Sequence, residues 1–204
     1  MKLGIVNYGL GNIRSIVNAI EFTSKDCKIK LLNTADELQD QDKLILPGVG
    51  AFGDAADILH RDQWVEGIEN ERKKGKYILG ICLGMQLLAS KSYEFGEFKG
   101  LNFISGEVKR IPSQKGLRIP HIGWNSVYWE GDYSLFKDIE SGADFYFVHS
   151  YYFQCTVPQN SIGETTHGLK FSSVVQKENV IGTQFHPEKS QKNGIQLINN
   201  FIDL

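Results

Sequence analysis

The chain has 204 residues, of which 41% are hydrophobic and 23% charged, as in an ordinary folded protein. Its formal net charge is −2 and its charged residues are mixed along the sequence, so nucleic acid is not expected as a partner. No apolar run reaches the roughly 18 residues of a membrane-spanning helix, and the N-terminus has no signal-peptide pattern. These features argue against a nucleic-acid-binding or membrane protein and predict a cytoplasmic one.

Strand-like and helix-like segments alternate in the first half of the chain. Strands are predicted at 3–6, 29–32, 44–46 and 77–81. Helices are predicted after Asn12, which could act as the cap, over 64–74 and from Met85. Such alternation indicates a parallel sheet covered by helices on both faces, with ligands bound beyond the carboxyl ends of the strands.

The second half changes to short β-rich runs separated by turns and ends in a helix. The runs lie at 108–111, 126–129, 145–148, 171–176 and 180–184. Their spacing predicts antiparallel or mixed pairing, while Ile195, Ile198 and Ile202 recur at helical spacing. Because no repeat, linker or low-complexity segment interrupts the chain, we expect a single domain over residues 1–204.

Cys82 is the best candidate nucleophile among three cysteines whose number and spacing suggest neither a disulfide framework nor a zinc site. It lies in Gly80-Ile81-Cys82-Leu83-Gly84, between a strand and a helix, as a nucleophile elbow requires. The flanking glycines would let other segments approach a tight turn, and a helix N-terminus favours a thiolate. A buried structural cysteine is the alternative on this pentapeptide alone.

A cysteine nucleophile needs a base, which His186-Pro187-Glu188 could supply together with an orienting carboxylate. In an extended chain residues i and i+2 point to the same side, so the imidazole and the carboxylate would meet. Pro47-Gly48-Val49-Gly50 ends another strand and could offer an N–H to an oxyanion, with a second N–H from Leu83. Each of these motifs is also compatible with an ordinary surface turn.

Six blocks along nearly the whole chain resemble one known family. They are NYGLGNIRS at 7–15, LPGVGAFGDA at 46–55, GICLGMQLL at 80–88, IPHIGWN at 119–125, FVHSYY at 147–152 and TQFHPEKS at 183–190. In content and order they are similar to the class I (triad) glutamine amidotransferases, and within these to the glutaminase subunits of imidazole glycerol phosphate synthase.

The resemblance implies a doubly wound, flavodoxin-like α/β domain with a central mixed sheet and extra antiparallel strands. It also implies a glutaminase with a thioester intermediate, which passes ammonia to a cyclase subunit of (β/α)8-barrel type in a heterodimer serving histidine biosynthesis. The implied roles are a triad of Cys82, His186 and Glu188, an oxyanion hole of Val49, Gly50 and Leu83, glutamine contacts from Gly50, Gln86, Ser150 and Tyr151, and an interface including Asn12, Trp124 and Lys189.

No cofactor or metal is expected, because the GLGN turn lacks the full dinucleotide pattern and nothing resembles a P-loop. His121 and His149 lie in family blocks, where they could line the site or the interface or serve as hydrogen-bonded structural histidines.

Three alternative functions stay open at this point. A similar glutaminase could supply ammonia to a sugar amidotransferase for a surface polysaccharide or flagellin glycan, with the same catalytic residues. A cysteine peptidase or a related α/β hydrolase with an elbow cysteine fits less well, given Glu188 and Gln86. A non-catalytic binding module is disfavoured because all three triad residues are present.

Overall fold

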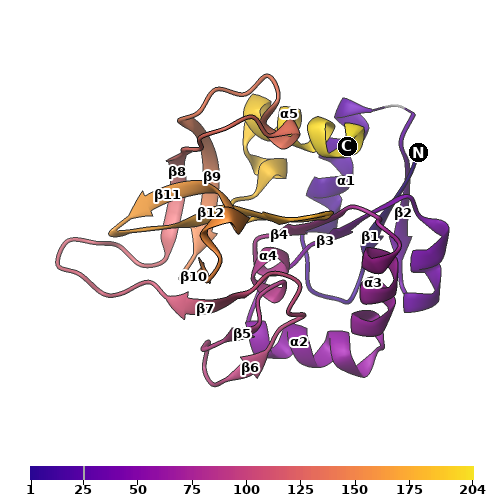
Figure 1. Ribbon diagram of the computed structural model, residues 1–204, viewed down its shortest axis with the longest axis horizontal. Coiled ribbons are helices and arrows are strands. Elements are labelled where there is room, and N and C mark those ends of the chain that lie inside the picture. The colour runs from indigo at the N-terminus through magenta and orange to yellow at the C-terminus, as the bar shows by residue number, and fades with distance from the viewer. Residues whose placement is uncertain (25) are drawn as a thin grey trace.

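The computed structural model describes residues 1–24 and 26–204, and its main feature is a large mixed sheet (Figure 1). Five of its strands run parallel in the order β2-β1-β3-β4-β13, and mostly antiparallel strands extend the sheet beyond β13. The parallel strands are β1 (Lys2–Val6), β2 (Lys28–Leu32), β3 (Lys43–Leu46), β4 (Ile78–Ile81) and β13 (Val180–Thr183). The extension consists of β12 (Leu169–Lys177), β10 (Tyr151–Cys155), β7 (Gly106–Arg110), β5 (Lys91–Ser92) and β6 (Phe98–Lys99), with β11 (Ser161–His167) paired to β12.

Helices cover both faces of the parallel strands, so the predicted doubly wound α/β fold with a mixed sheet is confirmed (Figure 1). One face carries α1 (Ile13–Thr23) and α5 (Gln191–Asp203), and the other carries α2 (Phe52–Arg61), α3 (Trp64–Lys73) and the short α4 (Leu83–Leu87). The alternation of side chains along β3 shows why two layers form. Leu44 and Leu46 join the core under α2 and α3, whereas Ile45 joins the core under α1 and α5.

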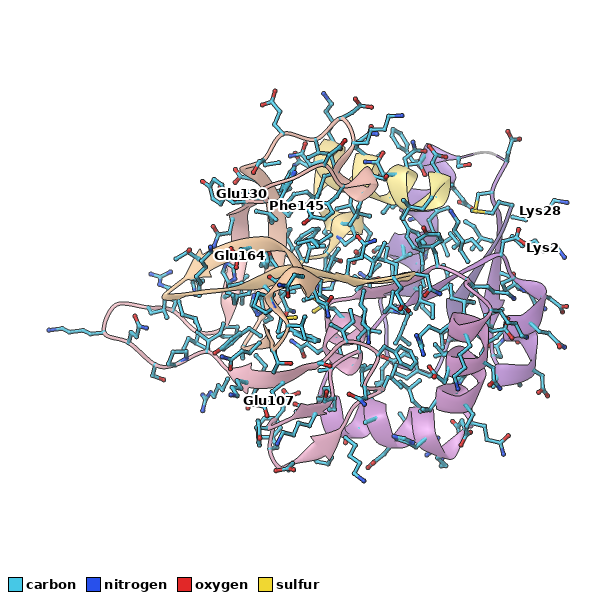
Figure 2. The ribbon with its side chains drawn as sticks, viewed as in Figure 1. Lys2, Lys28, Glu107, Glu130, Phe145 and Glu164 are labelled. Atoms are coloured by element: carbon cyan, nitrogen blue, oxygen red, sulfur yellow. The ribbon has the colours of Figure 1, made fainter. Side chains whose placement is uncertain are left out.

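An antiparallel ribbon of β8 (His121–Val127) and β9 (Ala143–His149) packs beside α5. Its inner side is anchored by Phe145 and Phe147, both fully buried, and Phe145 stacks on Phe185 with ring centroids 4.1 Å apart. Figure 2 shows Phe145 within the molecule, whereas Lys2, Lys28 and Glu107 lie at its periphery. The ribbon is thereby held against the segment that follows β13.

Three local expectations differ from the structure. Helix α2 was not predicted. Its buried face consists of Phe52, Ala55, Ala56 and Leu59 and is therefore built partly from small alanines. Asn12 occupies the N-cap position of α1, yet its side chain makes no capping hydrogen bond. The predicted strand at 126–129 begins earlier, at His121. In the described part of the chain, no helix is long and apolar enough to cross a membrane.

Candidate active site

Cys82 lies at the carboxyl end of β4 and forms the N-cap of α4. Its backbone has φ 55° and ψ −109°, a conformation that non-glycine residues rarely adopt. The turn is tight enough that a Cβ at Gly84 would overlap the carbonyl oxygen of Leu46, and one at Gly80 would lie 2.6 Å from the carbonyl oxygen of Gly84. The expectation that both flanking glycines are needed for close approach is therefore confirmed.

The strand order brings His186 to Cys82. β13 pairs in parallel with β4, and Thr183 is the register partner of Ile81. The Cys82 N–H donates to the Thr183 carbonyl at 2.8 Å, and the chain reaches His186 three residues later. The His186 N–H then donates to the carbonyl oxygen of Tyr146 at 2.9 Å, which ties this segment to β9.

The imidazole of His186 donates from Nδ1 to Oε1 of Glu188 at 2.8 Å, and both side chains are almost fully buried. The contact was expected from an extended chain, but Pro187–Lys189 forms a 3-10 turn that brings the two side chains together instead. Nε2 has no partner with hydrogen-bonding geometry among the described residues. That nitrogen is therefore available to exchange a proton with a thiol or a substrate.

Burial and charged neighbours act in opposite directions on His186. Burial alone would lower its pKa, but the negative charge of a Cys82 thiolate nearby and the hydrogen-bonded Glu188 carboxylate raise the pKa well above that of a free imidazole. The ring is therefore suited to hold the proton that Cys82 gives up. A thiolate beside an imidazolium is the reactive form of a cysteine nucleophile.

Cys82 and His186 line one cavity of about 320 Å³. The other lining residues come from the loop after β3, from α4, from the loop between β5 and β6, from the residue before β8, and from the region where β9 ends and β10 begins. They are Val49, Gly50, Leu83, Gln86, Glu94, Pro120, Val148, His149, Ser150 and Tyr151. All the residues predicted for the oxyanion hole and for glutamine are thus beside Cys82, and Glu188 lies behind His186.

The loop predicted to hold an oxyanion is fixed by Tyr8, a residue that the sequence reading did not single out. Its buried hydroxyl donates to the Pro47 carbonyl at 2.8 Å. Val49 and Gly50 follow in the wall of the cavity that Leu83, at the first position of α4, also lines. The first amides of a helix have no intrahelical acceptor, so Leu83 can offer its N–H to a ligand.

Gln86 is held in one orientation by the protein. Its Nε2 donates to the Tyr151 carbonyl at 2.9 Å and to Oε1 of Gln184 at 3.1 Å, which uses both amide hydrogens. Its oxygen is left to contact a ligand. Gln184 then presents its own Nε2 to Cys82 Sγ at 3.9 Å, and Sγ also faces the Val148 carbonyl at 3.9 Å.

Glu94 lines the cavity but was not predicted as a site residue, because a single glutamate in a loop does not by itself indicate a binding role. The Phe52 N–H donates to its Oε2 at 2.7 Å and the side chain is partly buried. Burial raises the pKa of Glu94 and nearby Asp54 adds to the rise, while the Phe52 N–H lowers it. A cationic group bound in the cavity would offset this cost of burial.

Comparison with known proteins decides the family. The family model described as glutamine amidotransferase class-I matches residues 4–204. The chain belongs to the class I glutamine amidotransferases. A crystal structure titled glutamine amidotransferase has a TM-score of 0.76 at 17% identity, with 98% of this chain and 97% of that chain covered. The structure of PurLQS from Thermotoga maritima has a TM-score of 0.75 at 21% identity, covering 99% and 97%.

More similar relatives of this class I amidotransferase carry one name. Imidazole glycerol phosphate synthase subunit HisH of Helicobacter hepaticus is 44% identical, covering 100% of this chain and 99% of that protein. The subunit of the same name from Caldanaerobacter subterraneus is 43% identical, covering 99% and 98%. The family, the enzyme class and the function expected from the sequence agree with these matches.

The residues predicted at a partner interface are only partly brought together in this amidotransferase. Trp124 is exposed on β8 with its ring centroid 6.1 Å from that of Tyr146, and Lys189 Nζ lies 6.0 Å from the same ring. Asn12 lies at the start of α1, which contacts the 3-10 turn that contains Lys189. Their interface role stays a prediction. Within the described residues, no group of three or more His, Cys, Asp and Glu could hold a metal ion.

Proposed function

We propose that this class I amidotransferase hydrolyses L-glutamine to glutamate and ammonia, with Cys82 as nucleophile, His186 as acid and base, and Glu188 as the carboxylate that orients His186. The observation that carries the proposal is the convergence of Cys82 and His186 on one cavity, with Glu188 2.8 Å from the far ring nitrogen. A cavity of about 320 Å³ is at the small end of ligand pockets, which suits one amino acid better than a peptide.

In the first half-reaction, Nε2 of His186 holds the proton given up by the thiol, and the Sγ thiolate attacks the carboxamide carbon of glutamine. The negative charge that develops on the amide oxygen is stabilised by backbone N–H groups of Val49 or Gly50 and of Leu83. The tetrahedral intermediate collapses as the C–N bond breaks. His186 returns its proton to the leaving nitrogen, so ammonia departs and a glutamyl thioester remains on Cys82.

In the second half-reaction, a water molecule attacks the thioester carbon while His186 takes its proton. The same N–H groups stabilise the second oxyanion, and the C–S bond breaks. The proton returns to sulfur, and glutamate leaves with one oxygen from water. Throughout, Glu188 accepts from Nδ1, which keeps Nε2 directed at the reacting atoms and stabilises the imidazolium.

Glutamine would be held by groups that complement each of its ends. The carboxylate of Glu94 is placed to pair with the α-ammonium, because one of its oxygens is already bound by Phe52 N–H and the residue lines the cavity. The free oxygen of Gln86 is a second acceptor, and Ser150 and Tyr151 line the same cavity. Both acceptors favour a substrate that carries N–H donors.

We further propose that the ammonia passes to a cyclase subunit of (β/α)8-barrel type, in a cytoplasmic heterodimer that serves histidine biosynthesis. The names of the 42–44% identical relatives support this, since they describe subunits of imidazole glycerol phosphate synthase. The exposed Ile122 and Trp124 on β8, with the exposed Tyr128 directly after it, supply an apolar surface of the kind that a partner would cover. In this proposal residues 1–204 act as one amidotransferase domain.

The test is glutamate release by the purified chain, alone and mixed with the cyclase subunit of the same organism and the cyclase's ribonucleotide substrate. Strong stimulation by the cyclase that is absent in Cys82→Ala supports both the chemistry and the partner. Glutamate release without stimulation by an active cyclase would contradict the partner and favour a sugar amidotransferase as the ammonia acceptor. Absence of Cys82-dependent hydrolysis under both conditions would contradict the glutaminase itself.

A further inference from the structure

Three histidines outside the triad lie together on the antiparallel strands beside the cavity. His121 and His149 are register partners on β8 and β9, and both are buried. His167 on β11 stacks on His121 with ring centroids 4.0 Å apart. The reaction described above uses none of them, although His149 lines the cavity.

The hydrogen bonds of this cluster have only one consistent direction. A carbonyl oxygen can only accept, so His149 Nδ1 must donate to the Tyr151 carbonyl at 2.8 Å. In a neutral ring Nε2 is then an acceptor, and His121 Nδ1 donates to it at 2.9 Å. By the same reasoning His121 Nε2 accepts from Asn125 Nδ2 at 3.1 Å. The Asn125 amide is oriented in turn, because its Oδ1 accepts the Ser126 N–H.

The surroundings keep both rings neutral, as this direction requires. Burial lowers the pKa of His149 to about 3 despite its bond to Tyr151, and the facing rings of His121, His167 and His186 also lower it. Burial likewise lowers the pKa of His121 to about 4, with His167 contributing. Protonation of His149 would place two N–H groups against each other across the His121–His149 contact, and protonation of His121 would do the same across its contact with Asn125 Nδ2.

The direction of these hydrogen bonds matters because the series ends at the groups around Cys82. The Tyr151 carbonyl accepts from both His149 and Gln86, which uses its two lone pairs. Gln86 is thereby fixed with its nitrogen toward the protein, and its second N–H orients Gln184. Gln184 consequently presents an N–H, and not its carbonyl oxygen, to Cys82 Sγ.

We infer that His121 and His149 are positioning residues of the glutaminase site, neutral imidazoles that act through the Tyr151 carbonyl to orient Gln86 and Gln184 toward glutamine and Cys82. This inference rests on the proposed function. It assigns to the buried pair a role in substrate and nucleophile geometry that differs from simple packing, since packing would be satisfied by an apolar side chain of similar size.

A matched pair of variants tests this. Asn at position 149 keeps a donor near the place of Nδ1, whereas Leu has the same branched shape without a donor. We expect His149→Leu to lower kcat/KM for glutamine roughly ten- to a hundredfold, the usual effect of an unsatisfied buried partner. His149→Asn should recover most of that loss. In His149→Leu, KM should rise because Gln86 is no longer held toward glutamine. Alkylation of Cys82 by iodoacetamide should slow because Gln184 no longer presents its N–H to Sγ.

The controls separate this inference from its alternatives. Equal losses in His149→Leu and His149→Asn, or unchanged kinetics in both, would overturn the positioning role while wild-type activity upholds the proposed function. A wild-type protein without Cys82-dependent glutaminase activity would overturn both.

If the position 149 variants do not fold, Asn125→Asp is the second test, because it keeps the side-chain shape but removes the donor to His121 Nε2. A several-fold fall in kcat/KM is expected there, and wild-type kinetics in Asn125→Asp would overturn the inference.

Discussion

The backbone of Cys82 has a strained conformation that places its side chain in the cavity wall. Positive φ in a non-glycine residue costs about 1–3 kcal/mol, which the surrounding structure has to offset. The result is a sulfur atom between the Val148 carbonyl and the Gln184 amide, each 3.9 Å away, in the wall of the cavity. Strain at this residue agrees with its proposed role as the nucleophile.

The reactivity of Cys82 should depend on His186. Because the pKa of His186 is raised, the ring keeps its proton through neutral pH, and the pair is lost only when the pH passes above that raised value. At pH 7 we expect iodoacetamide to alkylate Cys82 roughly tenfold faster in wild type than in His186→Asn. The gap should narrow as pH approaches about 8.5, where an ordinary thiol ionises unaided.

Peptide mapping provides the control for this measurement. Cys27 and Cys155 are free thiols whose pKa values are raised by burial, so their alkylation should be slow and the same in both proteins. Equal rates at Cys82 in wild type and His186→Asn would contradict the thiolate–imidazolium pair.

Glu94 should affect binding of glutamine more than the chemical step. Glu94→Gln keeps the side-chain shape but removes the charge proposed to pair with the α-ammonium. We expect KM for glutamine to rise roughly tenfold or more with kcat changed much less, as for a contact made equally in ground and transition states. Steady-state kinetics measure this, with Glu97→Gln, a change in the same loop outside the cavity wall, as the matched control. A fall in kcat at constant KM would contradict the assignment.

At the scale of elements, the turn from β4 to α4 depends on close contact with the end of β3. Gly84→Ala would place a methyl group onto the Leu46 carbonyl, so we expect a loss of about 1–3 kcal/mol and a fall in Tm of roughly 2–10 °C. Gly67→Ala in α3 is the matched control. Its methyl would meet mainly the movable Leu38 side chain, and helix propensity favours alanine by about 1 kcal/mol.

Thermal unfolding followed by circular dichroism distinguishes these two variants. A Gly84→Ala protein as stable as Gly67→Ala would mean that the turn can relax away from Leu46, against the close packing described for the elbow.

The same elements show what the sequence could and could not predict. The strands of the parallel sheet were predicted within a few residues because each is a short apolar run. The helices α1, α3 and α5 were predicted because their apolar residues recur at helical spacing. α2 was missed because alanines form much of its buried face. The contact of His186 with Glu188 was predicted correctly for an incorrect reason, since the local backbone is a 3-10 turn.

At the scale of the whole molecule, the site depends on strand order. β13 lies beside β4 although about a hundred residues separate them in sequence, and this places His186 near Cys82. Local patterns carry no such information; family resemblance supplied it. Glu94 and Gln184 could not be recognised in advance. For His121 and His149 only a place at the site was expected, because the roles of all four arise from contacts between distant segments.

The most direct test of the account is to trap the covalent intermediate. The protein is mixed with glutamine, quenched in acid within a turnover and mapped by peptide mass spectrometry. We predict a glutamyl group on the peptide containing Cys82, none on Cys27 or Cys155, and no adduct in Cys82→Ala. Glutamate formation with an adduct on another cysteine, or sustained by Cys82→Ala, would contradict the proposed mechanism.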